Sequence, residues 1–138
     1  MKKIIYGSIS LLILIMIYLF SAQSGSSSGA LSSSITTFIQ NLLPFLKKFE
    51  QLESIIRSLA HFSIYLFEGL FLTLFLNEYK IDNLLRVVLV FILLYAISDE
   101  IHQAIASINR AGEFVDVVKD FLGATCGALF SNKVLLKK

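Results

Sequence analysis

The chain has 138 residues, of which 56% are hydrophobic and 16% are charged, and its mean hydropathy is +0.76. Soluble domains average about 45–50% apolar and about 25% charged residues, so this composition indicates a membrane protein. The formal net charge of +2 is too small for a surface that tracks nucleic-acid phosphates, and one cysteine excludes an intramolecular disulfide framework or a cysteine-rich zinc site.

The apolar segments predict an all-α membrane protein with four transmembrane helices in a single domain over residues 1–138. A bilayer core about 30 Å thick takes about 20 helical residues per crossing. The predicted spans cover residues of about 4–22, 55–76, 84–104 and 116–136. The first resembles a signal peptide, but every candidate cleavage position has a residue that signal peptidase disfavours, so we interpret the segment as a retained anchor.

Residues 24–54 are predicted to lie outside the membrane, between the first two spans. Residues 24–34 contain seven serines and predict a solvated linker. Over residues 35–53, apolar residues recur at spacings of three and four, with a break near Pro44. This amphipathic pattern predicts one or two short helices lying in the outer membrane interface.

The basic residues predict that both termini lie in the cytoplasm. In that orientation seven of the twelve lysines and arginines are inside and five are outside, which is a mild positive-inside bias. The same orientation places nearly every unusual polar residue in the outer third of the membrane. Scattered structural polar residues are not expected to segregate in this way.

The second predicted span carries a file of four polar residues on one helix face. Arg57, His61, Tyr65 and Glu68 stand at offsets of 0, 4, 8 and 11 residues. Glu68 is close to the bilayer centre, where an ionised group is expensive. The structural alternative is a protonated Glu68 bonded to a neighbouring helix, with His61 as a packed hydrogen-bonding residue.

The third predicted span ends in a polar cluster. Asp99, His102 and Gln103 share a helix face, and Glu100 and Gln103 form a second pair three residues apart. A carboxylate that orients an imidazole is a common general-base unit and a common support for a metal ligand. Alternatively, these charges only mark where the membrane ends.

The fourth predicted span places Asp116, Asp120, Gly123 and Gly127 on one face. A glycine pair at this spacing allows two helices to approach closely, so we expect both aspartates to face the bundle. Simple packing explains the glycines equally well, and capping of the helix N-terminus explains the aspartates.

Several segments resemble the VanZ-like family of small bacterial membrane proteins: FSAQSG at 20–25, AHFSIY at 60–65, SDEIHQ at 98–103, Arg110, and DVVKDFLGATCG at 116–127. The resemblance implies a four-span plasma-membrane protein, linked in some members to low-level resistance to teicoplanin-type glycopeptides. It supplies no biochemical mechanism. The chain departs from the family pattern at Ser58, where a basic residue is frequent, at Ile64, where a glutamate is frequent, and at Ile108 and Asn109, where Pro-Gly is usual.

Three classes of function fit these residues. The first is a binding or catalytic site at the outer membrane face for an anionic envelope lipid or a cell-wall precursor. The second is a non-catalytic membrane protein that binds such a lipid or modulates an envelope partner. The third is a small oligomeric transporter that uses Glu68 as its deep ionisable group.

In the first class, arginines hold a phosphate or carboxylate and a histidine acts as acid or base. The candidate catalytic residues are His61, His102, Asp99 and Glu100. The candidate substrate-binding residues are Arg57, Gln103, Arg110, Asp116, Asp120, Glu68 and Tyr65. A metal-dependent version draws on His61, His102, Asp99, Glu100, Asp116 and Asp120. No compact histidine motif supports the metal version, and neither a cofactor nor an enzymatic activity is fixed by the sequence. We expect the three polar faces to meet in one pocket in the outer half of the bilayer.

Overall fold

The computed structural model describes residues 1–23, 25–106 and 114–136. Within these ranges the elements are α1 (Lys2–Ser21), α2 (Gly25–Leu42), the 3₁₀-helix η1 (Pro44–Lys48), α3 (Leu52–Asn77), α4 (Leu84–Ala106), α5 (Phe114–Phe130) and the π-helical turn η2 (Ser131–Leu135). The all-α prediction is therefore confirmed.

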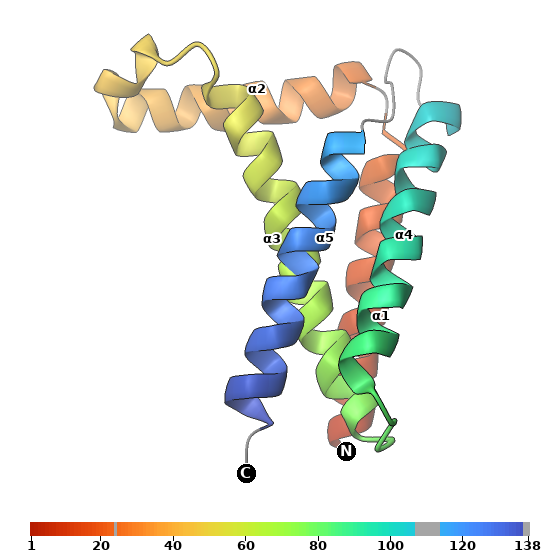
Figure 1. Cartoon of the computed structure of the whole chain (residues 1–138). Helices are drawn as coiled ribbons and strands as arrows, with labels where there is room; N and C mark the ends of the chain where they lie inside the picture. Colours follow the sequence, from red (N-terminus) through yellow and green to blue (C-terminus); the bar gives the residue numbers. More distant parts are fainter. Residues whose placement is uncertain (24, 107–113, 137–138) are drawn as a thin grey trace.

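Four helices form an elongated bundle, and α2 lies across one end of it (Figure 1). Helix α3 packs most extensively against α5, while α1 packs on α3, and α4 packs on α5. Both chain ends lie at the end of the bundle opposite α2. The bundle therefore has two different ends. Helix α2 covers one end, and the chain termini and the α3–α4 turn lie at the other.

Each predicted span coincides with a helix of the bundle. Two of these helices, α1 with 20 residues and α3 with 26 residues, are long and apolar enough to cross a membrane. At about 1.5 Å per residue, a 20-residue helix is about 30 Å long, which matches a bilayer core. Helix α5 is shorter, with 17 residues, and is continued by η2.

Helices α3 and α5 approach closely because glycines line their contact. A Cβ atom added at Gly123 would collide with the backbone carbonyl of Phe62, and one added at Gly127 would collide with that of Leu66. Gly69 on α3 makes the reciprocal approach to the backbone of Ala124. The expected close approach at the two α5 glycines is confirmed, and it brings the polar face of α5 against α3.

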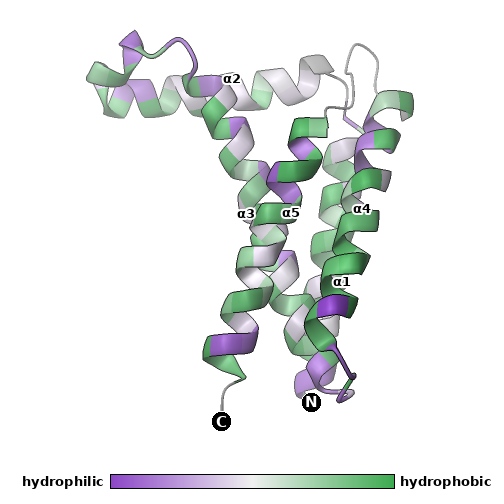
Figure 2. Cartoon of the chain, in the orientation of Figure 1, coloured by the Kyte–Doolittle hydropathy of each residue, from purple (hydrophilic) through white to green (hydrophobic). Residues whose placement is uncertain are grey.

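The exposed and buried side chains differ from those of a typical soluble protein. Large apolar residues such as Leu11, Leu59 and Leu94 are exposed, whereas Glu68, Asp99 and Asp120 are buried. Figure 2 shows hydrophobic residues over most of the length of the bundle and hydrophilic residues toward its ends. An apolar exterior with polar groups turned inward is expected of helices surrounded by lipid, where exposed charges are costly.

The prediction of a serine-rich linker is wrong. Residues 25–34 form the first half of α2, and Ser24 lies outside the described residues. The hydroxyls of Ser32, Ser34 and Thr36 each donate to the backbone carbonyl four residues earlier, at 3.1, 2.8 and 2.8 Å. These bonds satisfy the hydroxyls of Ser32 and Ser34 within the helix, so these two serines do not require a solvated coil.

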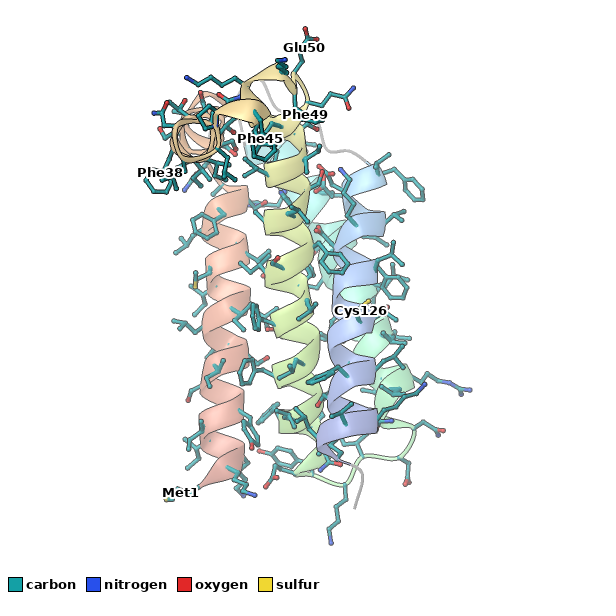
Figure 3. All side chains as sticks on the ribbon, turned by 90° about the vertical axis from the view of Figure 1, so that its left-hand side faces the viewer. Met1, Phe38, Phe45, Phe49, Glu50 and Cys126 are labelled. Carbon is teal, nitrogen blue, oxygen red and sulfur yellow. The ribbon has the colours of Figure 1, made fainter. Side chains whose placement is uncertain are left out.

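The prediction that residues 35–53 are helical is confirmed for most of the segment. Helix α2 ends at Leu42, and η1 begins at Pro44, which lacks the backbone N–H that the α-helix would need to continue. In Figure 3 the Glu50 side chain projects away from the bundle, whereas Phe38 and Phe45 lie on the side nearer the bundle. Both phenylalanines are exposed, so this segment presents an apolar surface beside the bundle end.

Candidate functional site

Beneath α2 lies a cavity of about 300 Å³ whose walls come from α1, α2, α3 and α4. Ile17, Leu31, Ile35 and Ile64 contribute to its apolar lining. Its polar lining includes Ser21, Arg57, His61, Tyr65, Asp99 and Gln103. The cavity therefore combines the two chemistries that an amphiphilic ligand requires.

Helix α3 supplies one polar wall through three residues spaced four apart. Arg57, His61 and Tyr65 all line the cavity, as their shared helix face predicts. Nη2 of Arg57 is 3.5 Å from Oε1 of Glu53, and the two side chains are about 40% exposed. Nε of Arg57 is buried and has no hydrogen-bond partner among the described residues. The guanidinium thus retains a donor group beside the cavity.

An imidazole and two carboxylates meet where α3, α4 and α5 come together. Nδ1 of His61 lies 3.2 Å from Oδ1 of Asp120. Glu100 joins them, because one ligand atom from each of the three residues lies within 4.8 Å of the others. Asp120 is fully buried and Glu100 is 6% exposed, so this cluster is almost closed to the exterior.

Asp99 and Gln103 form a buried pair on α4. Nε2 of Gln103 donates to Oδ2 of Asp99 at 3.2 Å, across one helical turn. Both residues also line the cavity. The predicted face of α4 therefore reaches the cavity through these two side chains.

The structure does not place His102 in this arrangement, and the expectation that Asp99 orients its imidazole is not met. His102 stacks on Tyr18 of α1, with ring centroids 4.5 Å apart, and its Nδ1 lies 3.3 Å from Oγ of Ser21. The hydroxyl of Ser21 also lies 3.2 Å from the backbone oxygen of Asp99. The carboxylate against an imidazole is instead Asp120, which belongs to a different helix from its partner His61.

Asp116 and Arg110 complete the set of predicted residues. Asp116 accepts a 2.6 Å hydrogen bond from Nζ of Lys119 and is not part of the cluster of His61, Glu100 and Asp120. Asp116 lies in the first turn of α5, which begins at Phe114, whereas Asp120 lies farther along the helix, so capping of the helix N-terminus does not explain Asp120. Arg110 lies outside the described residues.

Glu68 forms a separate polar centre. It is fully buried and does not line the cavity, and its Oε1 accepts a 2.7 Å hydrogen bond from Ser10 of α1. Seven residues separate Glu68 from His61, which corresponds to about 10 Å along the helix. The alternative of Glu68 bonded to a neighbouring helix therefore describes the observed contact.

The sequence interpretation missed the polar face of α1. Ser10 and Ser21 are buried, and the hydroxyl of Tyr95 on α4 donates to the backbone oxygen of Leu14 at 2.7 Å. The signal was the spacing of the two serines, because residues eleven apart share a helix face. These contacts hold α1 against α3 and α4.

The fold and the site define an all-helical protein that has candidate membrane-spanning helices and a polar cluster buried at one end of its bundle. The family model described as VanZ/LLP1 matches residues 8–136, and the chain belongs to the VanZ/LLP1 family. No curated protein and no solved structure matches the chain.

Proposed function

We propose that the protein is a plasma-membrane protein with four spans, α1, α3, α4 and α5, and that its cavity binds an anionic envelope lipid or a lipid-linked cell-wall precursor. In this arrangement α2 covers the outer end of the bundle and both termini are cytoplasmic. The apolar exterior of the bundle and the two candidate spans support the membrane setting.

The observation that carries the proposed ligand is Arg57. Its Nε–H is buried beside the cavity without a hydrogen-bond partner among the described residues. A buried N–H group without a hydrogen-bond acceptor is costly, the more so on a charged side chain. A phosphate or carboxylate oxygen of a ligand would accept that hydrogen bond. The apolar lining from Ile17, Leu31 and Ile35 then suits the adjoining hydrocarbon part of a lipid.

The covering segment supports the same location for the site. Phe38 is 65% exposed and Phe45 is 63% exposed, and both lie on the side of α2 and η1 nearer the bundle. Aromatic side chains on an amphipathic segment insert at the boundary between headgroups and acyl chains. An anionic headgroup in that plane would lie at the depth of Arg57.

The test compares lipid binding by the purified protein and two charge-neutralised variants in nanodiscs. We expect the unmodified protein to retain phosphatidylglycerol or undecaprenyl phosphate in preference to phosphatidylethanolamine in native mass spectrometry. Arg57→Gln should weaken retention of the anionic lipid about 10-fold or more, since a hydrogen bond to a charged group contributes about 1.5–3 kcal/mol. Lys119→Gln is the control, because Lys119 pairs with Asp116 away from the cavity. Equal retention by all three proteins would refute the proposal.

The link to teicoplanin-type glycopeptides belongs to the same proposal. We expect expression of the chain in a susceptible bacterium to raise the minimal inhibitory concentration of teicoplanin. Arg57→Gln should abolish that increase at equal membrane abundance. An increase that survives the substitution would separate the resistance from the cavity.

A catalytic version is favoured by the contact between His61 and Asp120. A carboxylate bonded to one imidazole nitrogen orients the ring, and an imidazole held in this way is a common acid or base in catalysis. His61 also lines the cavity, so its ring is close to the proposed ligand. If the site is catalytic, His61→Gln should retain the lipid in the nanodisc measurement while turnover is lost.

A further inference from the structure

We propose that His61, Glu100 and Asp120 bind a divalent transition-metal ion. This proposal does not depend on the proposed lipid ligand, because metal binding by these three side chains can be measured without any measurement of lipid binding. It selects three residues, one from each of α3, α4 and α5, as the protein ligands of one ion.

The geometry of the three side chains brings suitable donor atoms together. One nitrogen of His61 and one carboxylate oxygen from each of Glu100 and Asp120 lie within 4.8 Å of one another. Metal–ligand bonds of about 2.0–2.2 Å place the ligands of a tetrahedral ion roughly 3–4 Å apart. Small side-chain rotations that draw the three atoms together by about 1 Å would therefore complete the site.

The electrostatics of this region favour a cation. Three carboxylate residues, Asp99, Glu100 and Asp120, are buried within the same part of the bundle and are at most 6% exposed. Burying carboxylates is expensive unless opposite charge accompanies them. Asp120 adds an independent indication, since its Oδ2 is buried and has no hydrogen-bond partner among the described residues. A divalent ion would supply both the charge and a partner for that oxygen.

The donor set selects the class of metal. An imidazole nitrogen with two carboxylate oxygens suits Zn²⁺, Mn²⁺ or Fe²⁺, whereas Mg²⁺ and Ca²⁺ prefer oxygen ligands alone. Three protein ligands leave at least one coordination position open. Because His61 belongs to both the cluster and the cavity wall, that position is available to an oxygen atom entering from the cavity.

The test titrates Zn²⁺, Mn²⁺ and Co²⁺ into chelator-treated full-length protein in nanodiscs, with Mg²⁺ as the comparison ion. We expect one tightly bound transition-metal ion per chain and binding of Mg²⁺ at least 100-fold weaker. His61→Asn and Asp120→Asn should each weaken Zn²⁺ binding at least 100-fold. Asp116→Asn is the matched control on α5, because Asp116 pairs with Lys119 and lies outside the cluster.

A second measurement avoids reliance on variants that fail to fold. X-ray absorption of the Zn²⁺-loaded unmodified protein should show one imidazole nitrogen with oxygen neighbours. The proposal is overturned if no stoichiometric ion binds, if the absorption spectrum lacks an imidazole, or if folded Asp120→Asn binds Zn²⁺ normally. If the unmodified protein binds no metal and Arg110→Gln does not fold, the charge that neutralises the buried carboxylates would be assigned to Arg110 instead. Failure of metal binding by the unmodified protein would leave its lipid retention through Arg57 unchanged, so the two proposals can fail separately.

Discussion

Glu68 illustrates how one hydroxyl accommodates an acidic residue inside the bundle. Its side chain is fully buried, and Oε2 has no hydrogen-bond partner among the described residues. Ser10 supplies the contact to Oε1 from a different helix. The pair therefore joins α1 to α3 inside the bundle.

We expect Ser10→Ala to destabilise the protein by about 1–3 kcal/mol, because it leaves a buried acceptor without its donor. Ser8→Ala is the control, since Ser8 is an exposed residue of the same helix. Thermal unfolding in detergent should show a lower midpoint for the first variant only. Equal midpoints would mean that the Ser10 contact contributes nothing to stability.

His102 has the role of a contact between helices in this structure. Its ring stacks on Tyr18 and its Nδ1 lies beside Ser21. We expect His102→Ala to lower the unfolding midpoint and the membrane abundance, because α1 loses both contacts with this ring. Ser98→Ala should leave both unchanged, since the hydroxyl of Ser98 is exposed and bonds only within its own helix, to Tyr95, among the described residues. If His102→Ala has normal abundance but loses lipid binding, His102 would be a residue of the binding site and not a structural contact.

At the scale of helices, the α3–α5 contact depends on the absence of side chains. We expect Gly127→Ala to destabilise the protein by about 1–3 kcal/mol, because the added methyl group collides with the backbone of Leu66 and the helices must separate. Gly29→Ala is the matched substitution in α2, where an added Cβ meets nothing within 4 Å. That change should be neutral or stabilising by up to about 1 kcal/mol. Denaturation of the two variants in the same detergent provides the comparison.

Helix faces were predictable from the sequence, but partners between helices were not. Spacing correctly placed Arg57, His61 and Tyr65 on one face, and Gly123 and Gly127 at a close contact. The same reasoning paired Asp99 with His102 because both occur on one helix. The observed partner of an imidazole, Asp120, depends on how α5 is placed against α3, and periodicity within a single helix does not identify which residue of a neighbouring helix it meets.

The serine-rich part of α2 shows a second limit of the sequence interpretation. Composition alone predicts a solvated coil for residues 24–34. In the structure Ser28 and Ser32 line the cavity, and Ser32 also bonds back along its helix. The serine-rich helix therefore packs beside residues of α3 and α4 that are distant in the sequence, and composition within residues 24–34 does not report such contacts.

At the scale of the whole molecule, the two ends of the bundle should be accessible from opposite sides of the membrane. Lys47 and Lys80 are both exposed, and the elements that hold them, η1 and the α3–α4 turn, adjoin opposite ends of α3. In a Cys126→Ser background, Lys47→Cys should react with an impermeant maleimide on intact cells, and Lys80→Cys should react only after permeabilisation. Labelling of residue 80 from outside, without labelling of residue 47, would reverse the proposed orientation.

The polar contacts of α1 have a consequence for biogenesis in the proposed membrane setting. Helix α1 contributes hydroxyls and a backbone carbonyl to the bundle, whereas the acidic partners lie on α3 and α4. A serine is far less costly than an aspartate or glutamate for a helix that enters the bilayer alone. Helix α1 precedes α3 and α4 in the chain, and it can therefore insert into lipid before these partners are made. The acidic helices are made later, when the hydrogen-bond donors of α1 are already in the bilayer. The helix that costs least to insert alone is therefore translated before the helices that need its donors.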